Sequence, residues 1–228
     1  PVTGETLTLT NGANTGAGFQ GTANADTFDG SLNTNGTQTL TTLDSLDGGA
    51  GTDTLSAVFN TAGTVAATLT NIENVLFSSS AAVTLDLINS PSVVSVNSSG
   101  STAAMTVNNI PSTATTVTIT NTNQNHTLDY LNSAVTGTTD TAAVNVANVS
   151  AGALTVDNSI ETLSITSSTN ANTIASVAGN YGTLNTLGDS DLTITAGDAD
   201  AELIDASAFT GSLTVNTNNT AATTVTGG

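Results

Sequence analysis

The segment from Asp44 to Leu55 reads Asp-Ser-Leu-Asp-Gly-Gly-Ala-Gly-Thr-Asp-Thr-Leu. Its core, Gly48 to Ser56, matches the nonapeptide G-G-x-G-x-D-x-U-x, where U is a large aliphatic residue, at every specified position. The glycines permit a tight turn, and the aliphatic residue leads into a short buried strand. The Asp-x-Leu step also occurs nine residues earlier, at Asp44 to Leu46. Two consecutive turns of a coiled β chain are therefore predicted here.

The same residues carry the chemistry of a calcium site. Calcium is a hard cation that binds six to eight oxygen atoms at about 2.3–2.6 Å. Positive φ angles at glycine aim backbone carbonyls inward, and aspartates add carboxylate oxygens. The predicted ligands are the side chains of Asp26, Asp44, Asp47 and Asp53 and the carbonyls of Gly49 and Gly51. The alternative is a plain glycine turn that holds no metal.

Spacing along the chain suggests which ligands face each other. In a roll with two short strands per coil, residues eighteen apart stack on the same side. Asp26 and Asp44 have this separation, so we expect them to face one ion. Asn71 lies eighteen residues after Asp53, so Asn71 or Glu73 is a candidate ligand from the opposite side. For Glu73 the alternative is a solvated residue that precedes a strand.

Several segments resemble one family. The nonapeptide resembles the RTX repeats of secreted Gram-negative proteins. The frame formed by 21–30 and 43–49 resembles the opening of repeated modules in RTX-type S-layer proteins and giant adhesins, and 160–165 and 203–213 strengthen the likeness. RTX proteins usually carry tandem nonapeptides, whereas only one is complete here. The resemblance implies a calcium-binding protein that is exported to the cell surface.

The composition favours an external source of positive charge. The 228 residues include 18 acidic side chains, one histidine and no lysine or arginine, for a formal net charge of −18. Such a charge opposes compaction and repels polyanions, which argues against nucleic-acid binding. Divalent metal is one source of counter-charge, and the alternative is that the sparse carboxylates are simply solvated. The absence of cysteine excludes disulfides and thiolate metal sites and suits an exported protein.

Residues 57–228 show a different pattern from the turn-rich calcium segment at 1–56. Short apolar runs recur about every ten residues, with alternating inward and outward positions and Asn, Ser, Gly or Thr between them. The runs are 75–77, 83–87, 93–96, 105–107, 117–120, 128–131, 144–146, 154–156, 163–165, 184–187, 192–194 and 213–215. Two similar short segments around Glu73 and Glu161 lie 88 residues apart, which corresponds to about four coils of twenty residues. This pattern favours an all-β, right-handed parallel β-helix or β-roll continuous with the first segment, and the alternative is an antiparallel β-sandwich.

A second acidic cluster lies near the C-terminus. It contains Asp189, Asp191, Asp198 and Asp200. Each Asp-x-Asp pair places two carboxylates on one face of an extended segment, close enough to share a cation. Without a metal the two carboxylates repel each other, so both interpretations stay open.

The sequence argues against an enzyme. His126 is the only histidine, and serines are so common that a Ser-His-Asp arrangement has no diagnostic value. The prediction is a calcium-binding structural module of an extracellular S-layer or filament, and the alternative is an adhesion module. Self-association end to end, calcium and a cell-surface polysaccharide are the expected partners, and no stretch is apolar enough to span a membrane. The closing Thr226-Gly227-Gly228 resembles the start of another nonapeptide, so we expect a module of a longer chain.

Overall fold

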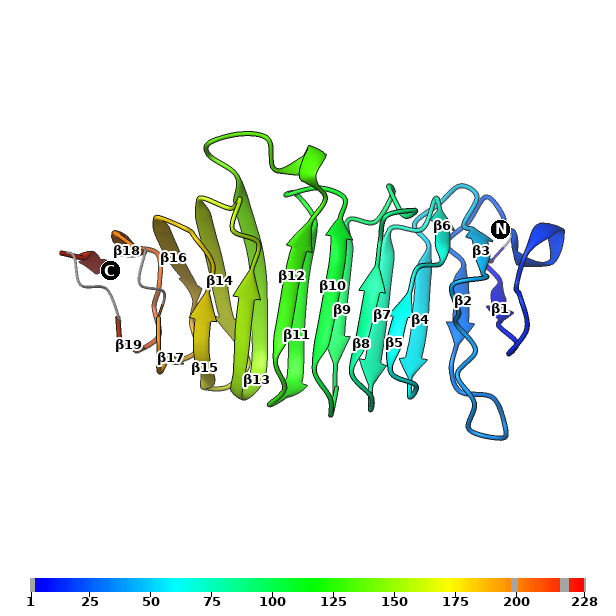
Figure 1. Cartoon of the computed structure of the whole chain (residues 1–228), viewed down its shortest axis with the longest axis horizontal. Helices are drawn as coiled ribbons and strands as arrows, with labels where there is room; N and C mark the ends of the chain where they lie inside the picture. The colour runs from blue at the N-terminus through cyan, green and yellow to red at the C-terminus, as the bar shows by residue number, and fades with distance from the viewer. Residues whose placement is uncertain (1–2, 198–200, 218–221, 228) are drawn as a thin grey trace.

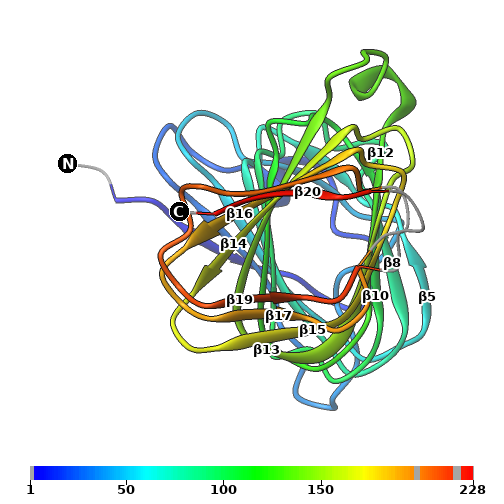
Figure 2. The same ribbon diagram turned by 90° about the vertical axis from the view of Figure 1, so that its left-hand side faces the viewer.

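The computed structural model describes residues 3–197, 201–217 and 222–227. Strands make up 49% of the chain and helices 3%, and the strands stack into a solenoid of about 10 turns (Figure 1). Viewed from its end, the chain winds around one axis (Figure 2). Every pairing between the described strands of the solenoid is parallel, which confirms the predicted β-helix or β-roll class. The antiparallel sandwich considered as an alternative is wrong.

Most coils contribute one strand to each of two long sheets. The first sheet contains β1 (Thr6–Thr8), β2 (Thr27–Gly30), β4 (Thr54–Phe59), β7 (Asn74–Ser79), β9 (Ser95–Ser99), β11 (Thr116–Thr122), the start of β13 (Thr141–Val156), β14 (Thr162–Ser168), β16 (Thr183–Gly188), β18 (Leu203–Ala206) and β20 (Thr224–Gly227). The second contains β5 (Gly63–Val65), β8 (Val83–Asp86), β10 (Met105–Ile110), β12 (His126–Tyr130), the end of β13, β15 (Asn172–Ala178), β17 (Leu192–Ile194) and β19 (Leu213–Val215).

Four shorter elements complete the described chain. The strands β3 (Ser45–Asp47) and β6 (Thr68–Thr70) pair with each other as a small third sheet near the N-terminus. Two 3-10 turns, η1 (Gly16–Phe19) and η2 (Asn132–Ala134), lie outside the sheets. Each of the twelve apolar runs in the sequence overlaps a strand, because a β strand with one buried face alternates inward and outward side chains. The strand β4 spans residue 56, so pairing continues across the expected boundary between the two segments.

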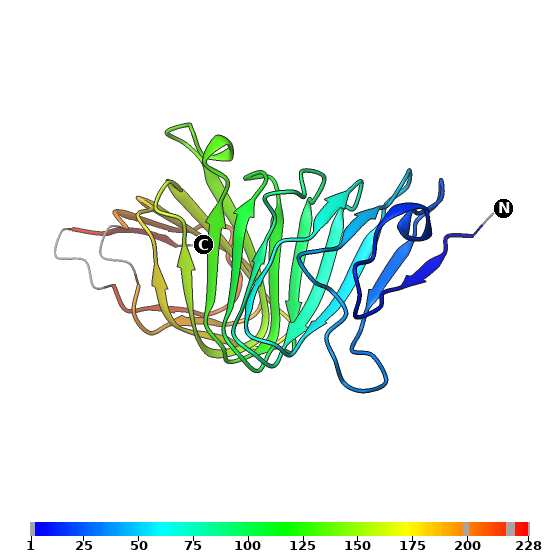
Figure 3. The ribbon, with the colours of Figure 1, turned by 45° about the vertical axis from the view of Figure 1, so that its right-hand side comes forward.

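The length of a coil follows from the register of the first sheet. Thr54 pairs with Asn74 and Asn74 with Ser95, so these coils contain 20 and 21 residues. This spacing agrees with the estimate of about twenty residues. Two coils contain 27 residues, from Thr27 to Thr54 and from Thr116 to Ala143. Their additional residues form the two loops that project from the stack, 31–43 and the loop that contains η2 (Figure 3).

The core consists of columns of aliphatic side chains that repeat from coil to coil. One column of the first sheet joins residues in direct register, namely Phe28, Leu55, Val75, Val96, Val117, Val144 and Ile165. All of them are buried. Neighbouring strands in a sheet lie about 4.8 Å apart, so medium-sized side chains fill the stack without large aromatic residues. The sparse aromatics are placed singly or in one pair, Phe59 and Phe77, whose ring centroids are 5.8 Å apart.

Asparagine makes the corners of the coils. Asn71, Asn109, Asn121 and Asn148 have φ angles of 49°, 54°, 54° and 55°. Side chains other than asparagine, aspartate and glycine rarely adopt this left-handed conformation. The corners also bind each other, since Asn148 Nδ2 donates to Asn121 Oδ1 at 2.9 Å. These four asparagines are therefore explained by the geometry of the corners.

The core columns predict a contrast between adjacent residues of β14. Leu163 is fully buried and Ser164 faces outward. We expect Leu163→Ala to lower the free energy of unfolding by about 2–5 kcal/mol, because a cavity opens in the stack. Ser164→Ala should change it by no more than about 0.5 kcal/mol. Urea denaturation of both variants checks this, and equal midpoints for the two would contradict the inward assignment of Leu163.

Candidate metal site at the acidic column

Acidic residues occupy the position immediately before the strand on successive coils of the first sheet. Glu5, Asp26, Asp53 and Glu73 precede β1, β2, β4 and β7, and the strand registers place them one above another. We call these four residues the acidic column. Farther along the stack, Asp140 and Glu161 hold the same position before β13 and β14. The column therefore concentrates negative charge along one edge of a chain that has no lysine or arginine.

Three carboxylates of the column, those of Asp26, Asp53 and Glu73, bind the backbone of the preceding coil. Asp26 Oδ1 accepts from Glu5 N–H at 2.5 Å, and Asp53 Oδ1 accepts from Asp26 N–H at 2.7 Å. Glu73 Oε2 accepts from Asp53 N–H at 2.8 Å. Hydrogen bonds from N–H groups to carboxylates are stronger than those between neutral groups. The column thus supplies acceptors to the N–H groups at the start of each strand and ties neighbouring coils together.

The carboxylate of Asp26 is fully partnered. Besides Glu5 N–H, it accepts hydrogen bonds from the N–H and the hydroxyl of Thr22. The bond from Glu5 N–H is the largest cause that lowers the pKa of Asp26, and burial opposes it. Asp26 is therefore held in its charged form by the protein itself.

Asp53 has the same position one coil later but a different environment. It is completely buried, and its Oδ2 atom has no hydrogen-bond partner. Burial raises the pKa of Asp53, and the neighbouring charges of Asp26, Glu73 and Asp47 add to that rise, while the hydrogen bond from Asp26 N–H opposes it. One carboxylate oxygen of the nonapeptide is therefore left without a donor or a counter-charge.

The glycines of the nonapeptide bring other oxygens close to Asp53. A Cβ atom on Gly48 would lie 2.6 Å from Asp53 Oδ2 and 1.9 Å from the carbonyl oxygen of Asn71, so only glycine fits. Gly49 has a φ angle of +84°, and a Cβ there would lie 2.3 Å from the carbonyl oxygen of Thr22. The turn therefore packs the Asn71 carbonyl oxygen close to the unpartnered carboxylate, with the Thr22 carbonyl oxygen against the next glycine. Oxygen atoms of this kind are the ligands that calcium prefers.

The other two aspartates of the predicted set have partners of their own. Asp44 is buried, its Oδ1 accepts from the N–H and Nδ2 of Asn14, and its Oδ2 accepts from Thr41 N–H. Asp47 Oδ1 accepts from Gly49 N–H and from Asn71 Nδ2. No three acidic or histidine side chains in the described part of the chain converge as a metal-binding group. A cation at this edge would depend on one or two carboxylates and backbone carbonyls.

The predicted eighteen-residue stacking is wrong for this part of the chain. Asp26 stacks on Asp53 and not on Asp44, because the loop 31–43 lengthens that coil to 27 residues. Glu73 stacks on Asp53 because their coil contains 20 residues, and its side chain binds the backbone of Asp53. Asn71 instead lies at a corner, where it binds Asp47.

Only half of the second acidic cluster lies in the described part of the chain. Asp189 and Asp191 lie in the turn between β16 and β17, where Asp191 Oδ1 accepts from Ser212 N–H at 2.8 Å and Asp189 Oδ1 accepts from the Ser190 hydroxyl at 3.3 Å. The two carboxylates thus have separate partners. Asp198 and Asp200 fall outside the described residues.

Sequence reasoning missed the role of Glu5 and Asn14. A signal for the acidic column was present, since an acidic residue, then Thr or Asn, then a large apolar residue recurs at 5–7, 26–28, 53–55, 73–75 and 161–163. Asn14 had no such signal, because it meets Asp44 across 30 residues.

Comparisons with known proteins do not assign the chain to a family. No protein-family model matches it, and neither the curated proteins nor the solved structures contain a match. In the ranges that the structure describes, no helix has the length and apolar character needed to cross a membrane. The likeness to RTX proteins therefore stays a prediction from the residues quoted above.

The contrast between Asp53 and Asp26 predicts opposite effects of removing charge. In chelator at pH 7, Asp53→Asn should raise the melting temperature, because it removes an uncompensated buried charge and offers a donor toward the Asn71 carbonyl. Asp26→Asn should lower the free energy of unfolding by about 1–3 kcal/mol, because it weakens the bonds from Glu5 and Thr22.

The effect of Asp53→Asn on stability is expected to depend on pH. The folded-state pKa of Asp53 is raised, so the folded protein takes up a proton as the pH falls through that pKa and the penalty of the buried charge disappears. The advantage of Asp53→Asn over wild type should therefore shrink in acid. Thermal melts across pH check this, and a constant loss of stability in Asp53→Asn at every pH would contradict it.

Proposed function

We propose that this chain is a calcium-binding structural module of an extracellular surface assembly. The observation that carries the proposal is Asp53 Oδ2, a buried carboxylate oxygen without a partner inside a glycine turn. A buried charge is costly unless it is paired or coordinated to metal. No lysine or arginine exists in the chain to pair with it.

The chemistry of the turn favours calcium over other cations. The nearby donors are carboxylate and carbonyl oxygens, with no cysteine in the chain and the only histidine buried elsewhere. Hard oxygen ligands in irregular geometry suit calcium, whereas magnesium requires near-octahedral geometry and keeps its waters. The proposed ligands are Asp53 Oδ2 and the backbone oxygens around Gly48 and Gly49, with Asp26, Glu73 and Asp47 contributing negative potential.

A structural role is supported by the shape and surface of the solenoid. Coils that contact only their neighbours form a rigid rod whose length is set by the number of repeats. His126 is buried and contacts a serine and a backbone carbonyl, so it is not arranged as a catalytic base beside a carboxylate. We assign no catalytic role to the chain.

Self-association is supported by the last described coil. Ile204, Leu213, Val215 and Val225 line an open hollow of about 420 Å³ there, and Val225 is 62% exposed. The strand β20 pairs with β18, and its other edge is free of described strands. Open edges and apolar side chains suit the addition of another β coil. We propose that a second copy of this chain joins here, with calcium reducing the repulsion between carboxylates.

Adhesion is the second candidate function. The observation that favours it is the pair of loops that project from the stack, 31–43 and the loop with η2, because binding residues often lie on loops held by a rigid scaffold. A cell-surface polysaccharide is the proposed ligand for this alternative. Adhesion would be favoured if the monomeric protein bound purified surface polysaccharide and a variant with shortened loops did not.

Calcium is expected to raise the thermal stability of the protein. A ligand that binds only the folded state stabilises it by about 2.7 kcal/mol at a hundredfold excess over Kd. Melting curves in calcium, magnesium and EGTA should separate, with the highest melting temperature in calcium.

Two aspartate variants test the position of the site. In Asp53→Ala the calcium response should disappear, whereas Asp157→Ala should keep calcium stoichiometry and affinity, because the Asp157 carboxylate accepts from the N–H groups of Tyr130 and Ser159, far from the turn. Identical wild-type melts in calcium and EGTA would overturn the proposal.

Assembly is expected to depend on calcium as well. Light scattering and electron microscopy across a calcium titration should show larger particles that disperse in EGTA, and magnesium should substitute poorly. Val225→Asp is the matched variant, because it places charge on the apolar end and should block assembly without changing calcium affinity. A wild-type protein that stays monomeric at millimolar calcium would contradict the assembly part of the proposal and leave the calcium site standing.

A further inference from the structure

A chain of polar side chains crosses the interior of the solenoid near its middle. Ser98 points inward from β9 in the first sheet, and His126 points inward from β12 in the second. Ser98 Oγ lies 2.9 Å from His126 Nε2 and 3.1 Å from Ser101 Oγ. Ser98, Ser101 and His126 are at most 3% exposed. These bonds join coils that are otherwise held together by backbone ladders and apolar packing.

The partners at the two ends fix the direction of every bond. His126 Nδ1 lies 3.0 Å from the carbonyl oxygen of Gln124, so Nδ1 carries the proton and donates. In neutral imidazole Nε2 is then an acceptor, and the Ser98 hydroxyl donates to it. The Ser101 hydroxyl consequently donates to Ser98 Oγ, and Ser101 Oγ accepts from Ser79 N–H at 3.1 Å. We call this sequence of bonds from Ser79 to Gln124 the polar relay.

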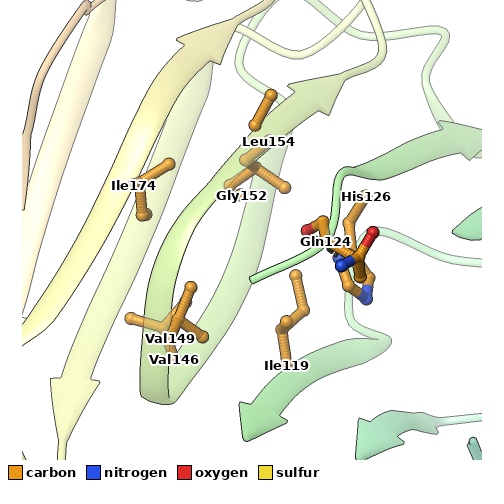
Figure 4. Close-up of a pocket in the computed structure, with 9 residues that line it drawn as sticks. Ile119, Gln124, His126, Val146, Val149, Gly152, Leu154 and Ile174 are labelled. Carbon is orange, nitrogen blue, oxygen red and sulfur yellow. Dashed lines mark hydrogen bonds between the residues drawn. The ribbon is translucent and has the colours of Figure 1, made fainter. Parts of the chain in front are cut away.

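The surroundings of His126 are uncharged. Met105 and Leu154 flank it in register on β10 and β13, and Ile119 lies near it on β11. Figure 4 shows His126 beside a small cavity lined mainly by aliphatic side chains. The cavity volume is about 10 Å³, enough for roughly one water molecule. Asp129, the carboxylate of β12, alternates to the outer face of the sheet and does not enter the interior.

We propose that the polar relay is a pH-sensitive latch that holds the central coils together when His126 is neutral and releases them on acidification. Protonated imidazole has two N–H donors and no acceptor. Ser98 must then accept from Nε2 and turn its own hydroxyl toward Ser101 Oγ. The Ser101 hydroxyl loses its acceptor, and a positive charge is left in an apolar interior without a carboxylate.

The direction of the pH effect follows from the environment of the ring. Burial is the largest influence on the pKa of His126 and lowers it from its ordinary 6.5, while the bond to Gln124 opposes this. The stability supplied by neutral His126 is complete above the unfolded-state pKa and falls as the pH drops toward the folded-state pKa. Each unit of separation between the two values reduces the folding equilibrium constant about tenfold at the acidic limit. The loss of stability thus starts just below neutral pH, and the latch itself opens at the lower folded-state pKa of His126.

The single histidine makes the latch directly measurable. A nitrogen-15 NMR titration of the wild-type imidazole in calcium should show an Nδ1–H tautomer that stays neutral well below pH 6.5. The protection factors of the β9 to β12 amides against hydrogen exchange should fall at least tenfold as the imidazole protonates. His126→Gln keeps an acceptor for Ser98 but cannot take up a proton in this range, so its exchange rates should lack that transition.

A second variant separates the latch from simple packing. Ser98→Ala removes the donor that stabilises neutral Nε2, so it should shift the NMR titration midpoint of His126 upward without adding charge to the core. A wild-type imidazole that titrates at its ordinary pKa, or the Nε2–H tautomer, would overturn the proposal. Equal acceleration of exchange in wild type and His126→Gln would overturn it as well, because the acid response would then come from other groups.

Discussion

The structure depends on the register of a parallel stack in which backbone and carboxylate hydrogen bonds join each coil to the next. A solenoid has no contacts between distant coils, so every coil is stabilised only by its two neighbours. Asp26, Asp53 and Glu73 add charged acceptors to that repeating interface. Because the chain has no lysine or arginine, these carboxylates are compensated by backbone N–H groups wherever the turn provides them. Asp53 is the place where one oxygen is not compensated.

The same constraint explains the unusual composition. Inward positions need medium-sized apolar side chains that repeat at the spacing of one strand, and corners need residues that tolerate a positive φ angle. Valine, leucine and isoleucine fill the columns, and asparagine makes the corners. Polar groups inside the stack such as His126 and Ser98 complete their hydrogen bonds across coils. A charged group inside the stack without such bonds therefore destabilises the fold, whether it is a carboxylate or an imidazolium.

Much of the fold could be predicted because its signals are local. The period-two runs mark strands such as β14 and β17, and the glycine turn at Gly48 marks a coil boundary. The register of the first coils could not be predicted, since the length of the loop 31–43 decides whether Asp26 meets Asp44 or Asp53. The partner of Asp44 is Asn14, a contact between loops with no periodic signal. The missing partner of Asp53 Oδ2 could not be predicted from the sequence either, because Asp26 occupies the same position before its strand and yet has all its carboxylate hydrogen bonds.

We propose that the glycine turn at Asp53 holds a cation that balances this buried carboxylate. Crystals grown in calcium and measured at a long X-ray wavelength test it most directly through anomalous scattering. We expect an anomalous peak within about 2.3–2.6 Å of Asp53 Oδ2 and of backbone carbonyl oxygens in the turn, with the coil register unchanged. A structure with the same register, no peak at the turn and Asp53 Oδ2 still without a partner would show that no cation binds there.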